Sequence, residues 1–301
     1  MEFTVRDYHL GHTLECGQAF RWRRRADGGY EGVVGRAVVR ASQAGGTLTL
    51  GGAPAETLAY YFQLHENLAA IVREFPDDEH LRRAVAFGHG MRLLRQEPWE
   101  CLASFICSSA KQFVQICQVV DNLCRALGEP FEAGGREAFA FPTASAVAHA
   151  TLPQLGLCGM GFRAKHLLAA ARRVDSGAAR LDAIAAMDYP RAVEELTKLP
   201  GVGPKVADCA LLFGWGRQEA FPIDVWIERA LRRLYFAGKR GVTRRRLVEF
   251  HRSYFGRYAG YAQQYLFHYV RNNPQVLEAG ITQTSGNCSS PSAVTRPRNA
   301  G

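Results

Sequence analysis

Residues 190–230, PRAVEELTKLPGVGPKVADCALLFGWGRQEAFPIDVWIERA, decide the fold of this chain. Apolar residues from Val193 to Leu199 recur at the spacing of one helix face. Pro200-Gly201-Val202-Gly203 interrupts that pattern, and glycine readily adopts the positive φ that a tight reversal needs. Pro204 suits the first position of a second helix, because its missing N–H would have been unpaired there anyway. The stretch therefore predicts a helix-hairpin-helix over 190–216, then a short loop and a third helix.

The glycines of this hairpin suggest that it holds an anion. Gly201 and Gly203 carry no side chains, so backbone N–H groups at the start of the second helix can approach an anion closely. We interpret that anion as a phosphate.

Two residues beside the hairpin could carry chemistry. Lys205 is predicted in the first turn of the second helix, where the helix dipole disfavours a cation and so favours the neutral amine that a nucleophilic lysine needs. Asp224 is predicted to cap the third helix, accept backbone N–H bonds and stay ionised. Each residue alone is ordinary, but their joint placement around a phosphate-binding hairpin predicts a catalytic pair.

The hairpin and the following loop resemble a known superfamily. LPGVGPKVAD at 199–208 and FPIDVWIERAL at 221–231 are similar to the helix-hairpin-helix, Gly/Pro-rich loop and aspartate signature of DNA glycosylases. The resemblance implies that Lys205 is the catalytic lysine of the bifunctional members and that Asp224 is their invariant aspartate. It also implies that the hairpin could hold a structural monovalent cation through its carbonyls. No other metal and no cofactor is expected.

Composition is consistent with a DNA-binding protein. The chain has 301 residues, a formal net charge of +9 and a pI near 9.3, which favours a polyanionic partner, although an acidic membrane surface would fit as well. No apolar run approaches the roughly 20 residues needed to span a bilayer. The N-terminus lacks the long apolar core of a signal peptide. We expect a monomer in the cytoplasm or nucleoid of a bacterium, or in the nucleus if the source is eukaryotic.

The cysteines indicate a reducing compartment rather than a disulfide framework. Eight are scattered along the chain, none with CxxC spacing, and several lie in apolar helical settings typical of buried free thiols. Only Cys288 lies near the C-terminus, so the four-cysteine iron–sulfur cluster of some glycosylase relatives cannot form there. This argues against the endonuclease III and adenine-mismatch branches.

The chain reads as an α+β protein with two domains. Residues 3–52 contain short alternating segments separated by Gly-rich turns, typical of an antiparallel sheet packed on helices on one face. We predict an N-terminal sheet domain with short helices over 1–90 and a mostly helical glycosylase domain over 91–280. Residues 281–301 are small, polar and Pro-containing, and are expected to form a disordered tail.

Two further segments resemble the eukaryotic-type 8-oxoguanine DNA glycosylases. LECGQAFRW at 14–22 is similar to the segment whose glycine carbonyl accepts a hydrogen bond from N7–H, a donor that the oxidised base has and guanine lacks. The resemblance gives that role to Gly17. In the segment 256–267 it implies that Gln263 reads the Watson–Crick edge of the flipped base and that Phe267 stacks on its face. Cys209 would pack against the opposite face.

The same resemblance implies a set of DNA contacts. In LGLCGMGFRAK at 155–165, Phe162 would wedge into the base stack beside the evicted nucleotide, which offsets part of the cost of unstacking. Arg163 would contact the cytosine side, and Gly201 and Gly203 would bind phosphate. Trp226 stands where mammalian members have a histidine near the sugar-phosphate, so local contacts should differ.

The residues expected opposite the lesion depart from the mammalian pattern. Ala110 and Gln115 fall where mammalian members have the asparagine and arginine that hold the orphaned cytosine. Alanine has no hydrogen-bonding side chain, and glutamine lacks the charged fork of arginine. We therefore predict a weaker preference for cytosine opposite the lesion.

These patterns together predict a bifunctional DNA glycosylase and AP lyase that excises 8-oxoguanine from duplex DNA by base flipping and Schiff-base chemistry. One alternative is a 3-methyladenine-type glycosylase, which shares the fold and the aspartate but does not need Lys205. The other is a non-catalytic helix-hairpin-helix DNA-binding protein, which would need neither Lys205 nor a base pocket.

Overall fold

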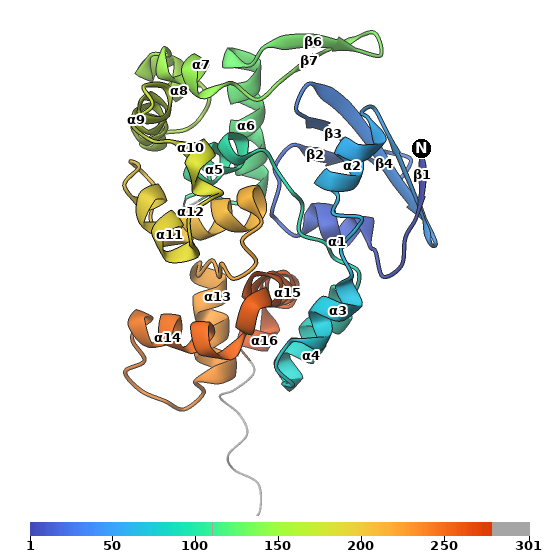
Figure 1. Ribbon diagram of the computed structural model, residues 1–301, viewed down its shortest axis with the longest axis vertical. Coiled ribbons are helices and arrows are strands. Elements are labelled where there is room, and N and C mark those ends of the chain that lie inside the picture. Colours follow the sequence, from blue (N-terminus) through green and yellow to red (C-terminus); the bar gives the residue numbers. More distant parts are fainter. Residues whose placement is uncertain (110, 279–301) are drawn as a thin grey trace, which may run out of the picture.

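The computed structural model describes residues 1–109 and 111–278; Ala110 and the predicted tail over 281–301 lie outside the described residues. Its first part is a five-stranded antiparallel sheet with strand order β1-β5-β4-β3-β2 (Figure 1). The strands are β1 Glu2–Thr4, β2 Trp22–Arg24, β3 Tyr30–Val34, β4 Ala37–Ala44 and β5 Thr47–Gly51. The predicted α+β class is confirmed, with the sheet at the N-terminus and helices making up most of the remainder.

Outside the sheet, the regular elements of the described chain are helices, apart from the hairpin of β6 Pro130–Ala133 and β7 Arg136–Phe139. Those of the first half are α1 Leu10–Glu15, α2 Ala55–Tyr61, α3 Leu68–Arg73, α4 Glu79–Phe87, α5 Pro98–Cys107 and α6 Phe113–Leu127. The following helices are α7 Ala144–Ala148, α8 Leu152–Leu157, α9 Arg163–Asp175, α10 Leu181–Ile184, α11 Tyr189–Thr197 and α12 Pro204–Ala210. The last are α13 Val225–Ala230, α14 Arg244–Tyr254, α15 Ala259–Asn272 and α16 Gln275–Glu278, with π-helical turns η1 Leu211–Trp215 and η2 Leu231–Tyr235 and the 3-10 turn η3 Gly256–Tyr258. Within 1–109 and 111–278, no helix has both the length and the apolar character needed to cross a membrane.

Two hydrophobic cores organise these elements. The smaller one lies between the sheet and α2, where Val39, Leu48 and Leu50 are fully buried against Leu58 and Phe62. Their alternation along β4 and β5 is the pattern of a sheet with one covered face. The larger core is helical. It includes helix α4 from the predicted N-terminal domain, which packs against α15 near the end of the described chain. The boundary at residue 90 stays a prediction.

The hairpin forms where the sequence predicts it. Helix α11 is followed by a turn in which Gly201 has a φ of +80°, and α12 begins at Pro204. Within the predicted span of 190–216, α12 ends at Ala210 and the chain widens into η1, which Gly216 closes in the left-handed conformation. A Cβ at Gly216 would overlap the guanidinium of Arg95, so packing against that arginine requires glycine there.

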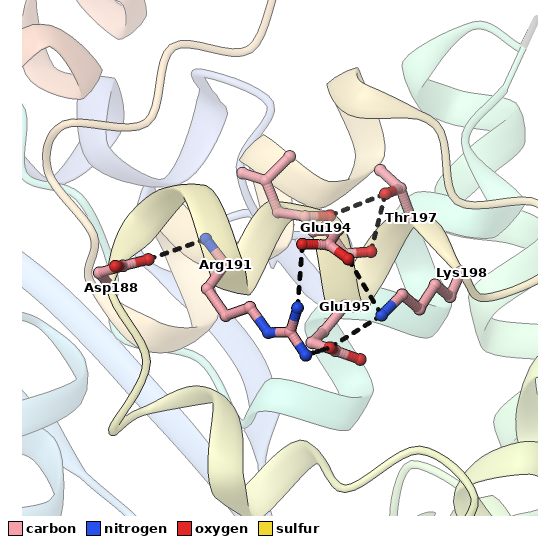
Figure 2. Close-up of polar contacts among 7 residues, drawn as sticks. Asp188, Arg191, Glu194, Glu195, Thr197 and Lys198 are labelled. Carbon is pink, nitrogen blue, oxygen red and sulfur yellow. Dashed lines mark hydrogen bonds and ion pairs between the residues drawn. The ribbon is translucent and has the colours of Figure 1, made fainter.

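The exposed face of α11 carries a network of ion pairs (Figure 2). Arg191 pairs with Glu194 and Glu195 at 3.0 and 2.6 Å, and Lys198 pairs with the same two carboxylates at 3.2 and 2.9 Å. Asp188 caps the helix by accepting the N–H of Arg191 at 2.9 Å. Exposed pairs of this kind contribute little singly, but they and the cap help to define the first helix of the hairpin.

The interior near α14 contains a histidine that should make folding sensitive to acid. His251 is buried and stacks on Phe221 with ring centroids 4.6 Å apart, and burial lowers the pKa of His251 from 6.5 to about 4. Because the pKa of His251 is lower in the folded state than in the unfolded chain, the contribution of neutral His251 to stability is complete above pH 6.5. That contribution is lost as the pH falls toward 4.

We therefore expect His251→Phe, which preserves the stack, to reduce acid sensitivity. Between pH 7.5 and pH 5 the free energy of unfolding of the variant should fall by about 2 kcal/mol less than that of the parent chain, since one pKa unit corresponds to about 1.4 kcal/mol. Urea unfolding at the two pH values measures this difference. Equal losses in both chains would show that His251 does not carry the effect.

Candidate active site

One cavity brings the predicted catalytic pair and the predicted base-binding residues together. It has a volume of about 870 Å³ and is lined by residues of α5, α6, α12, α13 and α15, by the loop after α1, and by Ser108, Ser109, Lys111 and Gln112 between α5 and α6. The predicted residues that line it are Gly17, Lys205, Cys209, Asp224, Trp226, Gln263 and Phe267. The cavity is not lined by Gln115, Phe162, Arg163, Gly201 or Gly203.

Lys205 is the second residue of α12, in the first turn as predicted. Its Nζ lies 3.3 Å from the Oγ of Ser108, the C-cap of α5, and 5.0 Å from the centre of the Phe105 ring. These two contacts hold the amine in the cavity without an ion pair in the part of the chain that the structure describes. The amine therefore lies at the cavity wall, and neither Ser108 nor Phe105 was identified as a site residue from sequence.

Asp224 is the N-cap of α13, and its Oδ1 accepts the N–H of Ile227 at 2.8 Å. Burial raises the pKa of this carboxyl, while the N–H groups of Ile227 and Trp226 and the nearby Lys205 act in the opposite direction. The predicted cap is confirmed. The sequence suggested only the influences that favour ionisation, because it could not show that the carboxyl is buried.

Gly17 lies in the loop between α1 and β2 with a φ of +88°, a conformation that favours glycine. The neighbouring carbonyls are occupied by buried side chains: Gln264 Nε2 donates to Cys16 O at 2.9 Å, and Gln96 Nε2 donates to Gln18 O at 2.8 Å. Among the hydrogen bonds of the described residues, none ends on the carbonyl of Gly17. The loop therefore leaves one backbone acceptor at the cavity wall for a ligand.

Helix α15 supplies Gln263 and Phe267 to the same cavity, one turn apart. Gln263 Nε2 donates to Pro222 O at 3.1 Å, while its Oε1 is buried and accepts no hydrogen bond from a described residue. A planar ligand that presents a donor could satisfy this oxygen. Cys209 lies on α12, and burial raises the pKa of its thiol to about 12, so it is a neutral apolar surface at pH 7.

A second helix-hairpin-helix, α8 to α9, carries Phe162 at its tip. The Phe162 ring is 58% exposed, which is unusual for a phenylalanine and suits a wedge. Arg163, by contrast, is buried: its guanidinium lies 4.3 Å from the centre of the Phe162 ring and donates to Met160 O at 3.2 Å and to Ser109 O. In this structure the guanidinium of Arg163 packs against the Phe162 ring. Its predicted contact on the cytosine side stays a prediction.

The two hairpins are neighbours. A Cβ on Gly201 would lie 2.7 Å from the Cβ of His166 on α9, so glycine allows the close approach. The His166 ring in turn contacts Phe162 edge-on at 6.1 Å. No atom lies within 4 Å of a Cβ built on Gly203, which leaves this side of the turn open. The Phe162 tip and the Gly201–Gly203 turn therefore lie next to each other.

Gln115 is used locally. Its side chain forms a capping box at the start of α6, where Oε1 accepts the N–H of Gln112 at 3.1 Å. Lys111, which the sequence did not single out, lines the cavity together with Trp226. Across 1–109 and 111–278 no group of three or more histidine, cysteine or acidic side chains is arranged to hold a metal ion.

Comparisons with known proteins identify matching families and relatives. Residues 1–102 match the family described as 8-oxoguanine DNA glycosylase, N-terminal domain, and residues 103–252 match the HhH-GPD superfamily of base excision DNA repair proteins. A probable N-glycosylase/DNA lyase of Methanothermobacter thermautotrophicus is 32% identical over 240 residues, 72% of this chain and 75% of that protein. The N-glycosylase/DNA lyase OGG1 of Arabidopsis thaliana is 27% identical over 89% of this chain and 78% of that protein.

A solved structure is also similar. It is the 8-oxoguanine glycosylase/lyase of Clostridium acetobutylicum in complex with double-stranded DNA containing cytosine opposite 8-oxoguanine. That protein is 34% identical, with a TM-score of 0.85 over 91% of this chain and 98% of its own.

Proposed function

This chain belongs to the 8-oxoguanine DNA glycosylase/lyase family, and we propose that Lys205 and Asp224 carry its reaction. It is a bifunctional DNA glycosylase and AP lyase of base excision repair, and its substrate is DNA. One observation gives the strongest support for assigning these roles to the residues. Lys205, Asp224 and the predicted base-binding residues line a single cavity, although they come from four separate segments of the chain.

DNA binding precedes the chemistry. Backbone N–H groups at the Gly201–Gly203 turn bind a phosphate, and the exposed Phe162 ring fills the space left when the damaged nucleotide leaves the stack. The extruded 8-oxoguanine enters the cavity. There its N7–H donates to the carbonyl of Gly17, its Watson–Crick edge meets Gln263, and its faces lie between Phe267 and Cys209.

The reaction then begins at C1′, where the base is exchanged for the Lys205 amine. The Lys205 amine attacks C1′, the C1′–N9 bond breaks with its electron pair leaving on the base, and the base takes up a proton. In the resulting adduct the C1′–O4′ bond breaks and the sugar ring opens. The proton on the amine nitrogen passes to O4′, which stays on C4′ as a hydroxyl, and a C1′=N Schiff base forms. A proton is then removed from C2′ and the 3′-phosphate departs, which nicks the strand. Asp224, when ionised, stabilises the positive charge that develops on the sugar.

Two other functions fit less well. A 3-methyladenine-type glycosylase shares the aspartate but needs no lysine in the first turn of α12, where Lys205 reaches into the cavity. A non-catalytic DNA-binding module needs the Gly201–Gly203 turn and no base pocket, so the unpaired Oε1 of Gln263 and the free carbonyl of Gly17 would have no use.

A direct assay tests the proposal. The purified chain is incubated with a duplex containing one 8-oxoguanine, with matched duplexes containing guanine or 3-methyladenine. We expect base release and a strand nick only on the 8-oxoguanine duplex. Release of 3-methyladenine without a nick would favour the alkylation glycosylase, and binding without any release would favour the DNA-binding module.

The opposite-base preference should be weak. The side-chain carbonyl of Gln115 accepts a hydrogen bond in the capping box of α6, and glutamine lacks the charged, forked guanidinium that could bind cytosine. We expect excision rates opposite cytosine, adenine, guanine and thymine to lie within about 10-fold of one another, since a good bidentate contact gives roughly 1–3 kcal/mol of discrimination. Single-turnover rates on the four duplexes measure this. A cytosine preference above 100-fold would contradict the prediction.

The proposed reaction needs no cofactor, because the nucleophile and the charged group are both side chains. The Gly201–Gly203 turn is open on the Gly203 side, so its backbone carbonyls could hold a monovalent cation that braces the turn, with no part in the chemistry. Since one chain supplies every proposed residue, a monomer is sufficient. The chain would act where chromosomal DNA is found, in the nucleoid or the nucleus.

A further inference from the structure

Helix α15 has a second stripe of polar side chains beside the one that faces the cavity. Gln264, His268 and Arg271 are spaced four and three residues apart, so they lie on one side of the helix. All three contact the segment that leads into the Gly17 loop. Gln264 donates to Cys16 O at 2.9 Å, His268 Nε2 lies 2.9 Å from the Nδ1 of His12, and Arg271 Nη2 donates to Glu15 O at 2.9 Å.

Arg271 and Gln264 are the members of this stripe that also line the cavity. A Cβ built on Gly17 would lie 2.7 Å from Arg271 Nη1 and 3.4 Å from the Phe267 ring. The guanidinium lies 5.5 Å from the centres of both the Phe267 and Phe113 rings. Arg271 therefore lies against the side of Gly17 that a larger residue would fill, and within cation–π distance of two aromatic rings.

We propose that Gln264, His268 and Arg271 form a clasp that fixes the carbonyl of Gly17 relative to Gln263 and Phe267, with Arg271 as a positioning residue for lesion discrimination. This inference rests on the proposed function, which makes that carbonyl the reader of N7–H.

The physical reason is that one helix both reads the base and holds the loop. Gln263 and Phe267 lie on α15, but Gly17 lies about 250 residues earlier in the chain, so only tertiary contacts set the distance between them. The carbonyls of Glu15 and Cys16 are held by α15, which leaves the carbonyl of Gly17 as the free acceptor. A single hydrogen bond discriminates strongly only when its acceptor is held in place in a buried pocket.

The test compares two reactions of the full-length chain. Excision of 8-oxoguanine requires the Gly17 carbonyl, whereas cleavage of a preformed abasic site requires Lys205 but no base reading. We expect Arg271→Met, which keeps an unbranched side chain but removes the donor, to slow single-turnover excision about 10- to 100-fold. Cleavage of the abasic duplex should change less than about 2-fold. Gln264→Leu should act in the same way.

Two further variants make the result specific. Arg271→Lys keeps a donor for Glu15 O and should recover most of the excision rate. Arg73→Met is a matched control. Like Arg271, Arg73 lies in the last turn of a helix and donates to a backbone carbonyl, that of Ala69, at 3.2 Å, but Arg73 does not line the cavity. It should leave both reactions unchanged.

Two outcomes would overturn the clasp. If Arg271→Met slows both reactions equally, it damages the fold or the lysine chemistry rather than base reading. If it slows neither, the Gly17 loop does not depend on α15. Failure of the proposed function is distinguishable, because the parent chain itself would then show no excision of 8-oxoguanine.

Discussion

Lys205→Gln is expected to abolish both base release and strand cleavage, with losses of about 10⁴-fold or more, because it removes the nucleophile of the first step. Glutamine is one atom shorter than lysine and is a neutral polar side chain, which suits a position beside the Ser108 hydroxyl, 3.3 Å from the amine in the parent chain. The fold and the affinity for DNA should therefore persist. Single-turnover assays on 8-oxoguanine and abasic duplexes, with a binding titration, measure all three quantities.

The matched control is Lys111→Gln. Lys111 is the other lysine that lines the cavity. Its replacement should weaken DNA binding at most and leave the rate of the bound complex unchanged. If Lys111→Gln caused the larger loss, the nucleophile would have been assigned to the wrong lysine.

Asp224→Asn is expected to lower the excision rate about 10²- to 10³-fold, the size of effect seen when a fixed electrostatic stabiliser is removed. Asparagine caps a helix as well as aspartate does, so it can accept the N–H of Ile227 and preserve α13. The substitution thus removes the charge without removing the cap. Single-turnover rates and a thermal unfolding curve separate the two contributions.

The pH dependence provides an internal check on the second prediction. Burial raises the pKa of Asp224, so the ionised, active form should be lost as the pH falls at a higher pH than for an exposed aspartate. The acidic limb of the excision rate should be present in the parent chain and absent in Asp224→Asn. An unchanged excision rate in Asp224→Asn, with α13 intact, would exclude a catalytic role for this carboxylate.

The parts of the fold that follow from local chemistry could be predicted from sequence. The turn with Gly201, the helix start at Pro204 and the cap at Asp224 are all set by backbone rules that act within a few residues. The antiparallel sheet could be predicted because its inward residues alternate and its turns contain glycine. For the base pocket, only the resemblance to a family connected Gly17 with Gln263.

Features that depend on tertiary contact could not be predicted. The two-stranded hairpin of β6 Pro130–Ala133 and β7 Arg136–Phe139 was not identified, because its strands are short and mixed in character. Helix α1 lies within residues 3–52, a region predicted as an antiparallel sheet. Gly216, which closes η1, packs against the guanidinium of Arg95, more than 100 residues earlier in the chain. Arg271 and Gln264 gave no signal because their partners are backbone carbonyls some 250 residues away.

The central claim is that the Lys205 amine forms a Schiff base with the sugar. Its most direct test is to incubate the chain with an 8-oxoguanine duplex and sodium borohydride, digest the product and identify the residue that carries the reduced sugar. A covalent adduct on Lys205, absent from the Lys205→Gln variant, is the predicted result. Base release without any adduct, or an adduct on Lys111, would contradict the account.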